Sequence, residues 1–113
     1  MNPFVLDKPA ILERLGGDEG IFAMMVDMFL TELDNNRQAL LTALAGDSAA
    51  LQREAHTIKG LLATFSDGFG AELAQTLEYQ AKNGQVDDAR GRVDMLLARV
   101  DEVAEVLRGL SAG

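Results

Sequence analysis

The chain has no cysteine and no tryptophan, and its 113 residues include one histidine and two prolines. Without cysteine it can form no disulfide framework, thiolate zinc site, iron–sulfur cluster or cysteine nucleophile. A single imidazole also argues against zinc and di-iron sites, which need two or more histidines when cysteine is absent. We therefore expect no metal site in the chain, and a reduced, cytoplasmic setting.

Basic residues are also scarce. Ten Lys and Arg stand against 18 Asp and Glu, which gives a formal net charge of −8. Such a surface repels phosphate backbones and anionic lipid headgroups. No apolar run approaches the roughly 20 residues of a membrane span, and residues 1–4 do not resemble the start of a signal peptide. We expect neither nucleic acid nor membrane contact.

Helix-forming residues dominate the chain, and glycines divide it into five apolar patterns. The length fits one domain, residues 1–113. The patterns predict an all-α fold, an antiparallel up-down-up-down four-helix bundle with a short extra N-terminal helix. The short helix is expected near residues 7–15, and the long ones near 18–45, 47–65, 69–83 and 86–110.

Apolar residues at steps of three and four predict the side of each long helix that faces the core. The predicted core residues are Phe22, Met25, Phe29, Leu33, Leu40 and Leu44, then Leu51, Ala55, Ile58, Leu62 and Phe65, then Leu73, Leu77 and Ala81, and finally Ala89, Val93, Leu96, Val100, Val103, Leu107 and Leu110.

The single histidine, His56, lies about a quarter-turn or more from the apolar stripe of its helix, so it should face outward. An exposed histidine is most often only a solvated side chain. Gly60, one turn later, costs a helix roughly 1 kcal/mol relative to Ala, and such a residue suits a place where a partner approaches the backbone. Lys59 on the same face would complement an anion on the ring. Together these residues indicate an imidazole that accepts phosphate.

The run Ala55-His56-Thr57-Ile58-Lys59-Gly60 resembles the His-x-x-Lys-Gly signature of histidine-containing phosphotransfer (HPt) domains of two-component phosphorelays. The resemblance extends over nearly the whole chain. It also includes Gly17-Asp18, Phe29, Gly46-Asp47, Ala71, Leu73, Leu77 and Glu78.

This resemblance implies that His56 accepts a phosphoryl group from a phospho-aspartate of one receiver domain and passes it to an aspartate of another. Neutral imidazole is a good nucleophile near neutral pH. The partners would be receiver domains of response regulators or hybrid sensor kinases, and the receiver would supply Mg²⁺. The chain has no Walker-type glycine loop, so we expect no kinase or ATPase activity of its own. We expect a monomeric phosphocarrier without a cofactor, either free-standing or part of a hybrid kinase.

The resemblance also assigns roles to neighbouring residues. Lys59 would stabilise the phosphoryl oxygens, and Gly60 would let the receiver approach. Glu78, 22 residues after His56, would accept a hydrogen bond from Nδ1–H and leave Nε2 free to attack, unless it is only a solvated charge. Lys82 would add positive charge or merely pair with Glu78. Further contacts at the rim of the docking surface are expected from Gln52, Arg53, Thr57, Ala63 and Thr64.

Two features depart from the family pattern. Leu61 and Leu62 follow the Lys-Gly pair, where a small residue is common, and they would pack inward or add an apolar element to the docking surface. The family's Gly-Ala pair at the start of the next helix is shifted or replaced here, and residues 66–70 fill the turn. Two other functions remain open: an HPt-like module that binds receivers or other signalling proteins without being phosphorylated, and a His-Glu acid/base hydrolase, which would need a cleft beside His56.

Overall fold

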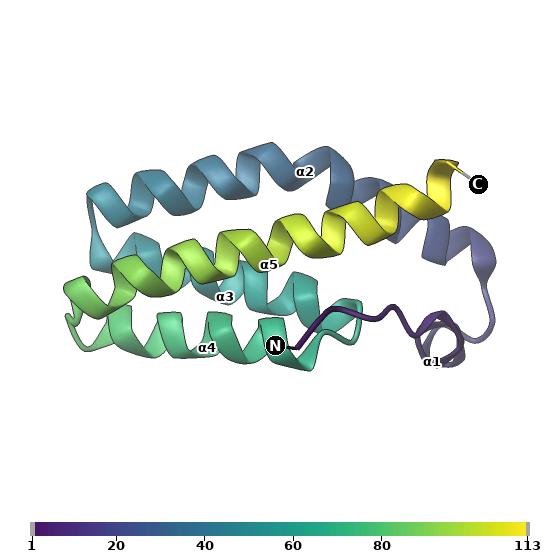
Figure 1. The fold of residues 1–113 in the computed structure, drawn as a ribbon, viewed down its shortest axis with the longest axis horizontal. Coiled ribbons are helices and arrows are strands. Elements are labelled where there is room, and N and C mark those ends of the chain that lie inside the picture. Colours follow the sequence, from purple (N-terminus) through teal and green to yellow (C-terminus); the bar gives the residue numbers. More distant parts are fainter. Residues whose placement is uncertain (1, 113) are drawn as a thin grey trace.

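The computed structural model describes residues 2–112, and every regular element within them is a helix (Figure 1). The all-α prediction is therefore confirmed. The helices are α1 (Lys8–Arg14), α2 (Glu19–Ala45), α3 (Ser48–Thr64), α4 (Gly68–Lys82) and α5 (Val86–Ala112).

An aspartate precedes each of the first four helices and caps it. The carboxylates accept hydrogen bonds from backbone N–H groups in the first turn, which otherwise have no partner inside the helix. The pairs are Asp7 with Ala10, Asp18 with Ile21, Asp47 with Ala49 and Asp67 with Gly70. These caps explain why the predicted helix starts agree closely with the observed ones.

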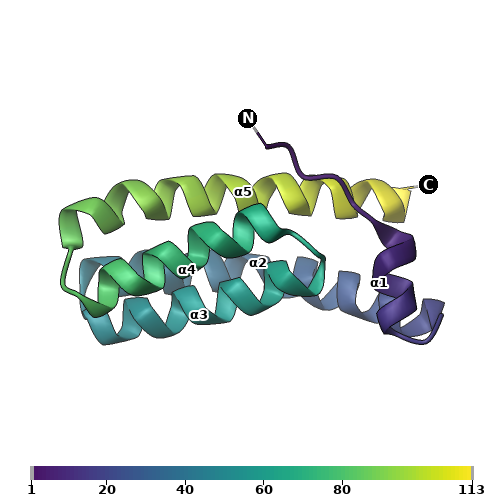
Figure 2. The same cartoon turned by 90° about the horizontal axis from the view of Figure 1, so that it is seen from below.

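The four long helices alternate in direction and form a bundle of 42 × 25 × 21 Å (Figures 1 and 2). Each packs against the next in the chain, and α5 closes the bundle against α2, so α3 and α5 lie diagonally across from each other. Figure 2 shows α1 crossing the end of the bundle where α2 begins. Within residues 2–112, no helix combines the length and apolar character of a membrane span.

Most of the predicted core is buried, but three predicted core residues are not. Leu110 is 43% exposed, because in the last turn of α5 it lines an open groove beside Leu30. Met25 and Leu44 are only partly buried against the core, whereas Val26, which was not predicted, is 6% exposed. The buried side of α2 is therefore rotated slightly from the predicted stripe.

A buried ion pair between Asp67 and Arg99 joins α4 to α5. Nε and one terminal nitrogen of Arg99 donate to the two oxygens of Asp67 over 2.9 and 2.7 Å, and the residues are 5% and 3% exposed. The hydrogen bonds to Asp67 raise the pKa of Arg99, and this effect exceeds the lowering by burial. A Cβ at Gly70 would lie 2.0 Å from an Asp67 oxygen, so the carboxylate needs glycine there.

The segment before α1 is held against the same pair. Arg99 donates to the backbone oxygen of Asn2, and its guanidinium lies 5.8 Å from the ring centre of Phe4 and 4.9 Å from that of Phe69. The Phe4 N–H donates to Glu102 over 2.7 Å, and Phe4 is 6% exposed. These contacts fix the N-terminal segment along α5.

Candidate functional site

His56 lies on the outer face of α3, as the apolar pattern of this helix predicts. Its neighbour Ala55 is fully buried and Ile58 is 3% exposed, whereas the His56 side chain is 66% exposed. The helix is anchored by the burial of its other side and by the Asp47 cap. The imidazole is thus presented on a rigid element and is open to a partner.

Glu78 of α4 contacts the imidazole from the side. Nδ1 of His56 lies 3.2 Å from Oε2 and 3.4 Å from Oε1 of this carboxylate. An ionised carboxylate only accepts hydrogen bonds, so Nδ1 carries the hydrogen in this contact. In the neutral ring the lone pair is then on Nε2, the nitrogen available for attack.

Lys59 binds the same carboxylate. Its Nζ lies 3.2 Å from Oε1 of Glu78, and its side chain is 30% exposed. Partial burial alone would raise the pKa of Glu78, but the hydrogen bonds from Lys59 and His56, together with the positive charge of Lys59, lower it below its ordinary value of 4.5. Glu78 is therefore an ionised bridge between the two α3 side chains at neutral pH.

The surface beside the imidazole is open at Gly60. A Cβ at Gly60 would meet nothing within 4 Å, and Gly60 and Ala63 are exposed. No internal packing therefore demands glycine at position 60. The space that its missing side chain leaves is available to a docking partner.

The remaining predicted residues make no hydrogen bond or ion pair with the His56 side chain among the described residues. Gln52 is half-buried, and Arg53 is exposed and lies 4.0 Å from Glu54. Thr57 is exposed and donates its hydroxyl to the Arg53 carbonyl over 3.2 Å. Lys82 is exposed at the end of α4. Among the ion pairs of the described residues, the partners of Glu78 are Lys59 and His56, so the alternative pairing of Glu78 with Lys82 is not seen.

An apolar groove, which was not predicted from the sequence, opens between α2 and α3 beside Thr57. This α2–α3 groove has a volume of about 360 Å³ and is lined by Met25, Met28, Phe29, Glu32, Asn36, Thr57, Leu61, Thr64 and Phe65. Leu61 is partly buried in its wall, while Leu62 is fully buried in the core, so the two leucines that follow the Lys-Gly pair have different roles. Met24 and Met28, which lie one turn apart and are both exposed, could have indicated a binding surface on α2, because apolar side chains seldom cluster on a solvated face.

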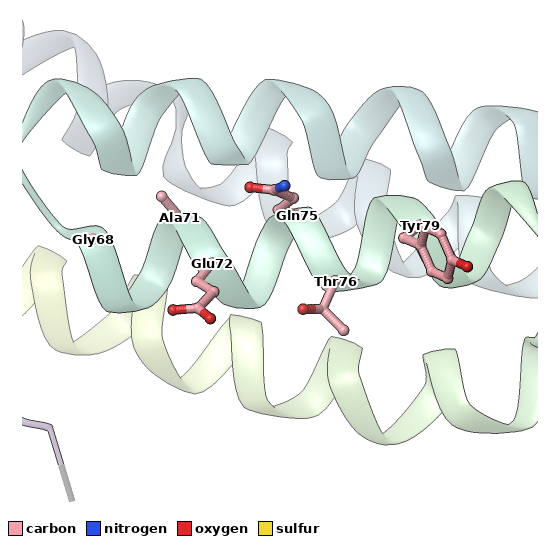
Figure 3. Close-up of a pocket in the computed structure, with 6 residues that line it drawn as sticks. All are labelled: Gly68, Ala71, Glu72, Gln75, Thr76 and Tyr79. Atoms are coloured by element: carbon pink, nitrogen blue, oxygen red, sulfur yellow. The ribbon is translucent and has the colours of Figure 1, made fainter.

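A second hollow, drawn in Figure 3, lies along α4 and is not part of the site. All six residues that line it belong to α4; Gln75 points toward α3, and Glu72 and Thr76 toward α5. Neither His56 nor Glu78 lines it. Within residues 2–112, no group of three or more His, Asp or Glu side chains is arranged to hold a metal ion.

Comparisons with known proteins agree with this geometry. The chain superposes on histidine-containing phosphotransfer protein B (HptB) of Pseudomonas aeruginosa PAO1 with a TM-score of 0.82 and 23% identity, over 92% of this chain and 91% of that one. It superposes on the HPT domain of an Hpt sensor hybrid histidine kinase from Shewanella with a TM-score of 0.80 and 20% identity, over 95% and 93% of the two chains. At these identities the similarity shows the fold.

No curated protein matches the chain in sequence. The sequence pattern of the Hpt domain, however, matches residues 24–108, which include α3, α4, most of α2 and α5, and the His56 motif. The chain therefore belongs to the Hpt domain family, whose members transfer phosphoryl groups through histidine in phosphorelays and interact with receiver domains.

Proposed function

We propose that His56 is the residue that carries the phosphoryl group in this domain. The observation that supports this most directly is the contact between Nδ1 and Glu78, which directs the ring hydrogen away from Nε2 while the imidazole stays 66% exposed. A nucleophile that is 66% exposed on a helix suits a reaction whose other groups are supplied by a partner.

The transfer balances without an added reagent. The lone pair of Nε2 attacks the phosphorus of the receiver's phospho-aspartate, an N–P bond forms, and the P–O bond breaks with its electron pair to regenerate the aspartate carboxylate. The ring then carries the phosphoryl group on Nε2 and a hydrogen on Nδ1. Its positive charge faces the carboxylate of Glu78, 3.2 Å away. The reverse reaction passes the phosphoryl group to a second receiver.

Lys59 and Gly60 would assist this transfer in different ways. Lys59 is proposed to donate to the phosphoryl oxygens, since an ammonium group on the same helix face stabilises an anion. Its Nζ lies 3.2 Å from the carboxylate of Glu78, and the same carboxylate contacts the imidazole. The open space above Gly60 would let the receiver's acidic pocket reach the ring.

The α2–α3 groove is proposed to contribute the apolar part of receiver docking. It begins at Thr57, next to His56, and its wall contains Met28 and Leu61. Exposed Arg53 and Lys82 would meet the acidic surface of the receiver. The same proposal has four further parts. The receiver binds the Mg²⁺, the HPt domain is a monomer, it is located in the cytoplasm, and it has no kinase activity.

The test is transfer from a receiver domain phosphorylated with labelled acetyl phosphate. We expect the chain to acquire an acid-labile, base-stable label, as a phosphohistidine would. Binding without label would favour the module that only docks. The hydrolase alternative has little support, because an imidazole that is 66% exposed is not enclosed as cleft catalysis requires.

A further inference from the structure

Met28 combines two properties that no other methionine among the described residues has. Its side chain lines the α2–α3 groove, and the residue is 61% exposed. Met25 also lines the groove but is only partly buried against the core. Met24 is as exposed as Met28, at 61%, but does not line the groove.

The groove would respond strongly to a polar change at this position. Phe29, Leu61 and Phe65 supply most of its apolar wall, together with the methionines. A thioether is a soft apolar group that adapts to a partner, whereas its sulfoxide is polar and stiff. A sulfoxide in an apolar contact must be desolvated without gaining a matched donor.

We propose that Met28 is an oxidation site that switches off receiver docking. A hydroperoxide such as H₂O₂ transfers one oxygen atom to the Met28 sulfur; the O–O bond breaks, the sulfur is oxidised by two electrons to the sulfoxide, and the peroxide is reduced to water. The sulfoxide weakens the contact of the α2–α3 groove with the receiver and so slows phosphoryl transfer. This inference rests on the proposed function, because it assigns the groove to receiver docking.

The chain offers two matched controls for this site. Met24 lies on the same helix, one turn away, with the same exposure. Met95 is 48% exposed on α5, which lies diagonally across the bundle from α3. Oxidation of either should leave the groove apolar.

The experiment compares the full chain before and after mild H₂O₂ treatment. Peptide mass spectrometry locates the sulfoxides. Two quantities are measured with a receiver domain phosphorylated by acetyl phosphate: the affinity of binding and the rate of label uptake. We expect Met28 to be oxidised before Met25, and receiver affinity to fall about tenfold, which corresponds to about 1.4 kcal/mol. Methionine sulfoxide reductases should restore the affinity.

Three Met→Leu variants identify the sulfur whose oxidation lowers receiver affinity. The affinity of each variant is compared before and after oxidation. Met28→Leu should make affinity insensitive to peroxide, whereas Met24→Leu and Met95→Leu should remain as sensitive as the wild type. Met28→Gln, which places a polar group in the groove, should reproduce the loss without peroxide.

Unchanged affinity after complete oxidation of Met28, or protection by Met24→Leu in place of Met28→Leu, overturns the inference. Failure of the proposed function looks different. In that case the untreated chain binds the receiver without acquiring label, and the loss of binding on oxidation still tests Met28.

Discussion

The carboxylate of Glu78 lies 3.2 Å from Nδ1 of His56, across the contact between α4 and α3. Its other oxygen lies 3.2 Å from Nζ of Lys59. The partly buried carboxylate of Glu78 thus orients the proposed nucleophile and holds the ammonium group of Lys59. Glu78 is therefore expected to affect both the reactivity of the imidazole and the stability of the domain.

Replacing Glu78 separates orientation of the ring from charge. Glu78→Ala removes the acceptor for Nδ1–H, and we expect phosphoryl transfer to slow about tenfold, as loss of a charge-assisted hydrogen bond of about 1.5 kcal/mol would produce. Glu78→Gln keeps an acceptor oxygen and should retain more of the rate. Single-turnover label uptake measures both. A Glu78→Ala rate equal to that of the wild type would remove Glu78 from the mechanism.

The lowered pKa of Glu78 also predicts a pH dependence of stability. A carboxyl group with a lower pKa in the folded than in the unfolded chain stabilises the fold above its unfolded value, near 4.5, and this stabilisation is lost as pH falls through the folded pKa. Glu78→Gln should therefore flatten the acid-side fall in the free energy of unfolding, measured by urea titration below pH 5. Glu72→Gln, an exposed position on the same helix, is the control. Equal slopes in wild type and Glu78→Gln would contradict the prediction.

Gly60 should show opposite effects on stability and transfer. A Cβ there meets nothing within 4 Å, so Gly60→Ala should stabilise α3 by about 0.5–1 kcal/mol while it reduces receiver affinity. Gly91, an exposed glycine within α5 with equally open space, is the control. Gly91→Ala should stabilise the domain similarly and leave affinity unchanged. If both variants bind the receiver as tightly as the wild type, close approach at Gly60 is wrong.

The Asp67–Arg99 pair should matter for stability alone. Removing one partner leaves a buried charge without its counterion. Asp67→Asn and Arg99→Met should therefore each lower the free energy of unfolding by about 3 kcal/mol or more, and the double variant should lower it by less than the sum of the two. The exposed pair of Arg108 with Glu105 is the comparison, and Arg108→Met should cost under about 1 kcal/mol.

Chemical denaturation measures these energies, and label uptake per folded molecule should stay constant. Additive losses in the double variant would show that the two side chains act independently.

The sequence was most informative where the pattern is local. Aspartate caps and glycines predict the helix bounds, and the apolar stripe of α3 predicts that His56 faces outward, because both depend on residues within a turn or two. The contact of Glu78 with His56 depends on the register between two helices, and family resemblance supplied it.

The Asp67–Arg99 pair was missed because its partners are 32 residues apart and each has a simpler local interpretation. Asp67 followed by glycine predicts a turn, and arginine is normally exposed. A signal was present: Arg99 lies three residues after Leu96 and four before Val103, within the core stripe, where a charge requires a partner. Phe4 was missed because it precedes the first helical pattern.

The most direct test of the account is label transfer from a phosphorylated receiver domain to the wild type and to His56→Gln. We expect the wild type to acquire an acid-labile, base-stable phosphoryl group and to pass it to a second receiver, while folded His56→Gln acquires none and still binds the receiver. Label on His56→Gln, or a wild type that binds receivers but never acquires label, would contradict the account.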